Sequence, residues 1–298
     1  MPNELLIAIL AGLGGMLGWG LADFFAKKTI DRVGDMVSLA WGHIFGTAVL
    51  LLVVLYQFRI RGQKVPLPDN FPAWFGVILF GVLQATVYLF VYRGFAKGQV
   101  GLLSPVFASF SGLTAIISIV ALGEIVGGYL SLGLATLFFG ILLINVDMGA
   151  LQSRRLRFSQ IPGFKEVGFA TLLATFWTLS WDWFIGGKDW LQYTFYMYAS
   201  MTVTILVLAI AQRVNLFIVT SKVWKFLALI GLCETAAYIA ITWGYGATTR
   251  TSVVALLSGA FSLPTIILAR MFLKERITAV QTVGSLTIIA GIMILAVL

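Results

Sequence analysis

The sequence is poor in the residues on which most soluble chemistry depends. Its 298 residues include one cysteine and one histidine, and only 11% of them are charged. The lone Cys233 excludes an internal disulfide, and one cysteine with one histidine excludes a Cys/His zinc site. Soluble domains carry about 25% charged residues. The composition therefore excludes a soluble enzyme, and the high apolar content excludes a disordered chain.

Motifs of catalytic and energy-coupled proteins are also absent from the sequence. There is no GxxxxGK[ST] phosphate loop, no HExxH helix and no GxSxG serine elbow. There is also no TVGYG-like potassium filter and no helix with arginine at every third position. We therefore expect no catalytic residue, no cofactor and no metal ion, and no direct use of ATP.

Apolar residues are what the sequence has in abundance. They make up 60% of the chain, and the mean hydropathy is +0.98. A transmembrane helix needs roughly 20 apolar residues. Run length predicts ten spans, at residues 4–26, 35–58, 72–95, 101–122, 128–147, 166–186, 190–212, 224–246, 251–272 and 277–297. The sequence therefore predicts an all-α polytopic membrane protein with ten transmembrane helices.

Internal similarity divides the chain into two halves. The pairs Tyr88/Tyr238 and Gly94/Gly244 are 150 positions apart, and Glu124/Glu275, Gly133/Gly284 and Gly140/Gly291 are 151 apart. More weakly, Asp23-Phe24-Phe25 matches Asp182-Trp183-Phe184. We predict a five-helix repeat at 1–147, a basic surface linker at 148–165 and a second five-helix repeat at 166–298. Because five is odd, the halves should cross the membrane in opposite directions, as an inverted repeat.

The first helix and the ends of the repeats resemble a known family. GWGLADFFAKK at 18–28 is similar to the family's opening helix, and each repeat ends on a glutamate, Glu124 or Glu275, followed by two spaced glycines. On these motifs the chain resembles the EamA-type branch of the drug/metabolite transporter superfamily over almost its whole length. The resemblance implies a carrier of small metabolites with both termini in the cytoplasm.

Two indications about orientation oppose each other. With a cytoplasmic N-terminus, only five of the 20 basic residues would lie on the cytoplasmic side, namely Arg59, Arg61, Lys64, Lys188 and Arg250. The positive-inside rule therefore favours external termini, whereas the resemblance implies cytoplasmic ones.

The net charge of +8 is spread along the chain, so we expect no nucleic-acid partner. We expect a monomer, with an oligomer left open, in a bacterial or archaeal plasma (inner) membrane.

Glu234 is the most prominent candidate for a functional side chain. It lies near the centre of the span 224–246, and an ionisable residue costs at least about 2.5–3.5 kcal/mol at the centre of a membrane helix. Gln84 is its repeat counterpart, and Tyr88 and Tyr238 follow these two residues by one turn. We interpret all four as substrate-binding, with Glu234 also able to exchange a proton. The alternative is a protonated Glu234 that is hydrogen-bonded to a neighbouring helix, with Gln84 as its partner.

Asp23 and Asp182 form a second matched pair, close to helix ends. Trp19 shares a helix face with Asp23, and Trp177 precedes Asp182 by five residues. An aromatic ring beside a carboxylate suits an amine. We therefore assign both tryptophans to substrate binding and both aspartates to coupling or gating. The alternative is structural, because Asp23 can pair with Lys27 and tryptophans gather at membrane interfaces.

Other residues extend this assignment. Trp243 belongs to the aromatic set that we assign to substrate binding, with packing as the alternative. His43 is a candidate for a proton relay or for a bond between helices. Pro264 should bend the span 251–272 and serve either as a gate hinge or in packing. Glu124 and Glu275 should instead be structural, because they offset the positive ends of the helices that follow them.

Together these residues predict a secondary transporter that works by alternating access. We expect it to export small organic metabolites, namely amino acids or related amines, with proton coupling through Glu234. One alternative is a carrier of phosphorylated or nucleotide-linked sugars that uses Lys27, Arg93, Arg250 and Arg270. A different class, a membrane-embedded lipid-modifying enzyme or a channel, is disfavoured by the missing motifs.

Overall fold

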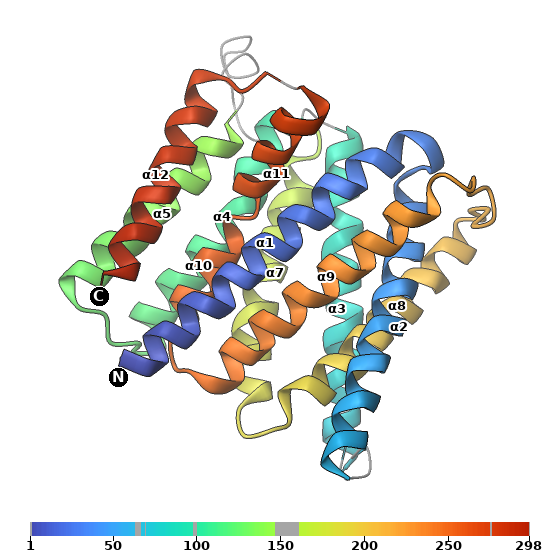
Figure 1. The fold of residues 1–298 in the computed structure, drawn as a ribbon, viewed down its shortest axis with the longest axis horizontal. Coiled ribbons are helices and arrows are strands. Elements are labelled where there is room, and N and C mark those ends of the chain that lie inside the picture. Colours follow the sequence, from blue (N-terminus) through green and yellow to red (C-terminus); the bar gives the residue numbers. More distant parts are fainter. Residues whose placement is uncertain are drawn as a thin grey trace.

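The computed structural model describes residues 2–62, 67–68, 70–97, 100–146, 161–274 and 276–297, and these described residues fold into helices and their connections, without a strand (Figure 1). The helices are α1 (Pro2–Val33), α2 (Asp35–Arg61), α3 (Phe71–Lys97), α4 (Val100–Val120), α5 (Gly128–Asn145), α7 (Phe164–Ile185), α8 (Trp190–Ala211), α9 (Trp224–Ala247), α10 (Thr251–Gly259), α11 (Ser262–Leu268), the π-helical turn η2 (Ala269–Leu273) and α12 (Ala279–Ala296).

Nine segments of the described residues are long and apolar enough to cross a membrane. They confirm the prediction of a polytopic helical membrane protein. The predicted span 166–186, which folds as α7, is not among the nine. This helix buries several hydroxyl groups: Thr171, Thr175 and Thr178 each donate to the carbonyl four residues earlier. Hydropathy alone understates such a helix, because the hydroxyls are satisfied within it.

The outer surface of the bundle is apolar. Leu52, Phe75 and Leu172 are exposed to 66%, 55% and 65%, whereas Trp181, Tyr198 and Tyr238 are almost completely buried. A soluble protein rarely leaves so many large apolar side chains uncovered. The molecule therefore has a lipid-facing apolar exterior and an interior that contains aromatic rings with polar groups.

The predicted span 251–272 is a broken helix. α10 ends at Gly259 and α11 begins at Ser262, so the break lies one turn before Pro264. Proline cannot bond the carbonyl four residues earlier, which here belongs to Ala260. The helix is thus interrupted at Ala260 and Phe261, just before the position of the predicted bend. α1 packs against it, because Thr265 donates to the carbonyl of Gly20 at 3.0 Å.

α5 and α12 pack against each other through glycines (Figure 1). A Cβ on Gly140 would lie 2.7 Å from the nitrogen of Ile288, and one on Gly291 would lie 2.8 Å from the nitrogen of Leu137. Gly284 meets Ile144, and Gly133 meets Leu295. The helices are antiparallel, because rising numbers in α5 meet falling numbers in α12. Each contact also has a reciprocal partner at the repeat offset.

The other helix contacts follow the same reciprocity. Each contact of one half has an equivalent in which the halves exchange roles. The α1–α9 contact corresponds to α7–α3, the α2–α9 contact to α8–α3, and the α1–α10 contact to α7–α4. The pairs α2–α8, α4–α10 and α5–α12 each join matching helices of the two halves. Every one of these pairings therefore joins the N-terminal half to the C-terminal half.

The bundle has two ends, and the basic residues Arg32, Arg213 and Lys222 lie at one of them. We call the end with the α1–α2 connection at Gly34 and the α8–α9 connection at 212–223 the basic end. The other end, with the α7–α8 and α9–α10 connections and both chain termini, is the terminal end (Figure 1). Most of the predicted linker, 148–160, lies outside the described residues. α7 begins at Phe164, inside the predicted linker range.

Replacement of Gly284 by alanine tests the α5–α12 contact. The new methyl group would press on the backbone of Ile144, so we expect a lower thermal unfolding temperature in detergent, with overpacking costing about 1–3 kcal/mol. Gly168→Ala in α7 is the control, because its Cβ would meet nothing within 4 Å. That helical substitution should stabilise by about 0.5–1 kcal/mol. Equal melting temperatures for both variants would contradict the packing.

Candidate functional site

A cluster of polar side chains lies in the middle of the bundle around Glu234. Tyr88 of α3 donates its hydroxyl to Oε1 of Glu234 at 2.7 Å, and Tyr198 of α8 donates to Oε2 at 3.3 Å. Nε2 of His43, from α2, lies 3.4 Å from Oε1. Glu234 therefore has polar neighbours from three helices other than its own. The hydrogen bonds to neighbouring helices that the alternative interpretation expects are present, but Tyr88 and Tyr198 make them, and Gln84 bonds Tyr238 instead.

One ring nitrogen of His43 faces Glu234, and the other faces the backbone. Its Nδ1 lies 2.9 Å from the carbonyl oxygen of Leu39, which can only accept a hydrogen. Nδ1 therefore carries a proton, and Nε2 faces the carboxyl group of Glu234. The histidine is fully buried and Nε2 has no hydrogen bond among the described residues. A small approach of the two side chains would let them share a proton across the 3.4 Å gap.

The cluster contains matching residues from the two halves. Gln84 donates to the hydroxyl of Tyr238 at 3.0 Å, and this bond is the counterpart of the Tyr88–Glu234 bond. His43 stacks on Tyr198 with ring centroids 5.3 Å apart. At the same offset, Thr47 and Thr202 are hydrogen-bonded at 2.8 Å. The structure thus brings Gln84, Tyr88, Glu234, Tyr238 and His43 together.

Aromatic rings surround Tyr238. The ring centroids of Trp19, Trp177 and Tyr198 lie 5.9, 6.5 and 5.3 Å from its own. Nε1 of Trp177 donates to the carbonyl of Phe80 at 2.9 Å, whereas Nε1 of Trp19 is buried without a hydrogen bond in the described structure. Trp19 therefore retains a free donor beside the polar cluster.

A small cavity connects the cluster with Asp23. It has a volume of about 50 Å³ and is lined by Trp19, Ala22, Asp23, Ala26, Ile30, Ser38, Leu39, His43, Tyr88, Tyr92, Ile230 and Glu234. This space accommodates a few waters and is too small for an organic substrate. Asp23 is an exposed residue, whereas Glu234 is buried. The cavity therefore runs from the surface to a polar centre around which the structure is nearly closed.

Trp243 and Asp182 lie apart from this cluster, towards the terminal end. Trp243 is nine residues beyond Glu234 on α9, which is two and a half turns. Asp182 accepts a hydrogen bond from Thr251 at 2.5 Å. Pro264 packs against Gly20 of α1. These three predicted residues therefore do not touch the central carboxyl group of Glu234.

Glu124 also differs from its predicted role. The sequence predicts that it offsets the positive end of the following helix, α5. In the structure it accepts from the backbone nitrogen and hydroxyl of Ser252 at 2.9 and 2.5 Å and from Ser118 at 2.7 Å. Glu124 therefore caps α10, which comes from the other half. The reason is that the connection 121–127 turns towards α10. Glu275 lies outside the described residues.

Two members of the centre are not identified by the sequence, Tyr198 and Met201. The Sδ atom of Met201 lies 4.0 Å from the Tyr238 hydroxyl. α8 shows little sequence similarity to α2, so the two helices do not align by residue type. One signal in the sequence points to Tyr198. Thr47 and Thr202 are 155 positions apart, and the same spacing pairs His43 with Tyr198.

An apolar helical bundle with polar groups at its core is the architecture of a multi-pass membrane protein. The EamA-like transporter family model matches this chain at residues 6–146 and 165–297. The chain belongs to the EamA-like transporter family, as the sequence resemblance predicts, and is a membrane transporter.

Two further comparisons show what the chain is similar to. The chain is 32% identical over 133 residues to the WAT1-related protein At3g02690, chloroplastic, of Arabidopsis thaliana. The match covers 43% of this chain and 30% of that protein. A solved crystal structure shares the fold with a TM-score of 0.73 and 18% identity, over 97% of both chains. At that identity the likeness concerns the fold alone.

Removal of the Glu124 carboxylate tests the closure of the terminal end. In Glu124→Ala the start of α10 loses its cap, and a lost helix cap costs about 0.5–2 kcal/mol. We expect a lower melting temperature in detergent. Glu166→Ala is the control, because Glu166 bonds the exposed Lys97 at 2.6 Å, and surface pairs contribute little. If both variants melted with the wild type, Glu124 would not hold the terminal end.

Proposed function

We propose that this transporter is an alternating-access carrier that exports amino acids or related amines. The observation that supports the proposal is the acidic, aromatic character of the cavity. Glu234 and Asp23 line it together with Trp19, Tyr88 and Tyr92. Carboxylates attract an ammonium group, and aromatic faces bind both cations and apolar side chains. The lipid bilayer is the surrounding partner, and a monomer contains the whole site.

We further propose that the two halves form an inverted repeat of ten spans, with α7 as the tenth. The reciprocal contacts support this: two antiparallel helices whose contacts repeat with exchanged roles are related by a two-fold axis perpendicular to them. In a membrane such an axis lies in the bilayer plane, as in many carriers. α7 has 22 residues, a length of about 33 Å at 1.5 Å per residue.

The His43–Glu234 pair supplies the proposed proton coupling. With one proton between them, the pair is neutral or internally compensated, which suits a low-dielectric interior. An incoming ammonium group would take the carboxylate of Glu234 as its partner and release the proton towards His43. Return of the proton would then displace the amine. The exchange is proposed from the 3.4 Å separation.

Alternating access also needs gates at both ends. In the proposed cycle the terminal end opens when the bonds of Asp182 to Thr251 and of Glu124 to Ser252 break. The helix break before Pro264 lies between these bonds and the basic end, and is the proposed hinge. With basic residues inside, the basic end faces the cytoplasm of a bacterial or archaeal cell, and substrate enters there.

The sugar-phosphate alternative has weaker support. An anionic substrate needs cations in the cavity, but the ionisable groups lining it are Asp23, Glu234, the two tyrosines and the single histidine. Arg250 donates to the carbonyl of Ile125 at the terminal end and does not line the cavity. Cavity charge therefore favours a cationic group on the substrate.

Counterflow in proteoliposomes tests the carrier and its coupling. Vesicles preloaded with unlabelled phenylalanine should accumulate labelled phenylalanine above protein-free vesicles. The rate should depend on pH over the range of about pH 5.5 to 8, because the proposed cycle moves a proton through Glu234. In Glu234→Gln the fold should persist, because the amide still accepts from Tyr88, while the pH dependence should disappear.

Two results would contradict this proposal. An absence of accumulation with folded wild-type protein would remove the amino-acid assignment and favour lipophilic amines or phosphorylated sugars. An unchanged pH profile in Glu234→Gln would remove Glu234 from coupling and leave the carrier assignment in place.

The aromatic wall is tested by Tyr238→Ala with Tyr238→Phe beside it. Loss of the ring should raise the half-saturation concentration at least about tenfold, a cost of about 1.4 kcal/mol, while phenylalanine at 238 should retain most of the affinity. Tyr56→Ala is the control, because Tyr56 is 68% exposed on α2. It should change the constant by no more than about twofold. Equal effects of the two alanine variants would identify the rings as packing.

A further inference from the structure

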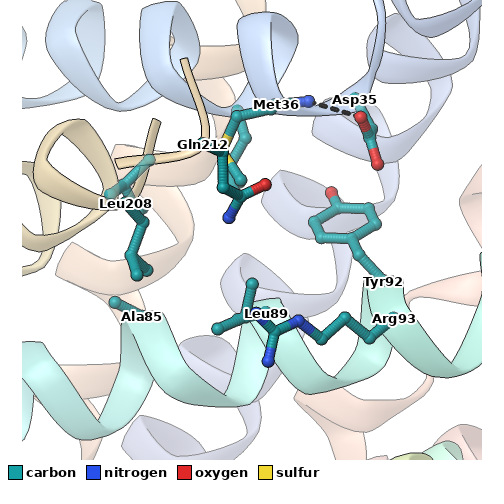
Figure 2. Close-up of a pocket in the computed structure, with 10 residues that line it drawn as sticks. Asp35, Met36, Ala85, Leu89, Tyr92, Arg93, Leu208 and Gln212 are labelled. Atoms are coloured by element: carbon teal, nitrogen blue, oxygen red, sulfur yellow. Dashed lines mark hydrogen bonds between the residues drawn. The ribbon is translucent and has the colours of Figure 1, made fainter. Parts of the chain in front are cut away.

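A second pocket lies at the basic end, outside the central cavity. It has a volume of about 130 Å³ and is formed by α2, α3 and the end of α8 (Figure 2). Its lining residues are Asp35, Met36, Leu39, Ala85, Leu89, Tyr92, Arg93, Ile205, Leu208 and Gln212. Leu39 and Tyr92 also line the central cavity, so these two side chains separate the pockets. We call this space the vestibule.

Two charges of opposite sign lie on the vestibule wall without neutralising each other. The Asp35 carboxylate accepts the backbone N–H of Met36 at 2.7 Å, and the Arg93 guanidinium lies 5.9 Å from the ring centre of Phe90. Neither side chain forms an ion pair within the described ranges. Each charge therefore remains available to a ligand.

The remaining wall suits an apolar group beside the two charges. Figure 2 shows the Gln212 amide and the Arg93 side chain on opposite sides of the pocket, with Tyr92 beside Asp35. Leu89 and Leu208 supply apolar surface to the same pocket. A guanidinium binds a carboxylate through two parallel hydrogen bonds, and a carboxylate accepts from an ammonium group.

We propose that the vestibule is a binding site for a zwitterionic amino acid, with its ammonium group on Asp35 and its carboxylate on Arg93. The side chain of the ligand lies against Leu89, Leu208 and the Tyr92 ring. This site precedes the central cavity on the path from the basic end. Its role as a receiving site rests on the proposed function, but its binding chemistry does not. Exposed single charges bind weakly, so the site selects ligands that carry both.

Three probes with similar carbon frameworks test the two charges one at a time. Phenylalanine carries both charges, phenethylamine only the ammonium group and 3-phenylpropionate only the carboxylate. Binding is measured by calorimetry on the full chain in detergent, in a Glu234→Gln background that removes the central carboxylate. Phenylalanine should bind about tenfold more tightly than either single-charge probe, because only it engages both Asp35 and Arg93.

Variants that remove one charge should weaken the binding of some probes and not of others. Arg93→Gln should weaken phenylalanine and 3-phenylpropionate about fivefold or more and leave phenethylamine unchanged, and Asp35→Asn should weaken phenylalanine and phenethylamine alone. Asp31→Asn and Arg32→Gln are matched controls, because both are exposed neighbours outside the lining. Equal weakening of all three probes by a variant, or none, would overturn the proposal.

A lipid headgroup could offer the same pair of charges. Binding is therefore repeated in nanodiscs of phosphatidylcholine with and without phosphatidylethanolamine. Phenylalanine binding that is equal in both supports the free amino acid. Competition by phosphatidylethanolamine that Arg93→Gln abolishes would assign the vestibule to lipid and overturn the proposal.

Counterflow in proteoliposomes of the wild-type protein and of the Arg93→Gln and Asp35→Asn variants separates this proposal from the proposed function. Intact phenylalanine counterflow without charge-selective binding would overturn the vestibule alone. Charge-selective binding without counterflow would support the vestibule as a zwitterion site and remove the carrier assignment for amino acids.

Discussion

A carboxyl group in the middle of α9 sets the constraint that the arrangement of the other helices satisfies. An unpartnered carboxylate inside a membrane costs at least about 2.5–3.5 kcal/mol, so Glu234 requires polar partners from neighbouring helices. They come from α2, α3 and α8. These helices must therefore approach α9 at one depth, which fixes the register of four helices at once.

Small residues make this approach possible. A Cβ on Gly231 would lie 2.5 Å from the carbonyl oxygen of Gly42, and one on Gly81 would lie 2.6 Å from that of Met197. Backbones in membranes pack closely where such residues meet. Gly231 and Gly81 are counterparts in the two halves, three residues before Glu234 and Gln84. The backbone contacts are therefore symmetric, and the difference between the halves lies in the side chains they bring together.

Much of this architecture follows from local sequence, and part of it does not. Apolar runs define the helices, and the cost of a charge in the membrane singles out Glu234. The repeat offset then leads from Glu234 to Gln84 and pairs Tyr88 with Tyr238. Proline chemistry also accounts for the break before Pro264. Tyr198 and the Glu124–Ser252 bond are not predictable in this way, because they depend on which helices of the two halves meet. For α7 the length indicates a membrane span, but the threonines that bond within the helix lower its hydropathy.

The hydrogen bonds at the terminal end have no equivalent at the basic end, because the matching positions of the two halves carry different residues. Asp182 bonds Thr251 and Glu124 bonds Ser252, so the terminal end is closed by bonds between side chains. At offsets of 150 or 151 the matching positions are Val100, Gly101 and Leu102, none of which carries a hydroxyl. Asp23, the counterpart of Asp182, thus has no such donor at the matching positions. Asp23 therefore lines the cavity without the hydroxyl partner that Asp182 has, on the side from which the vestibule opens.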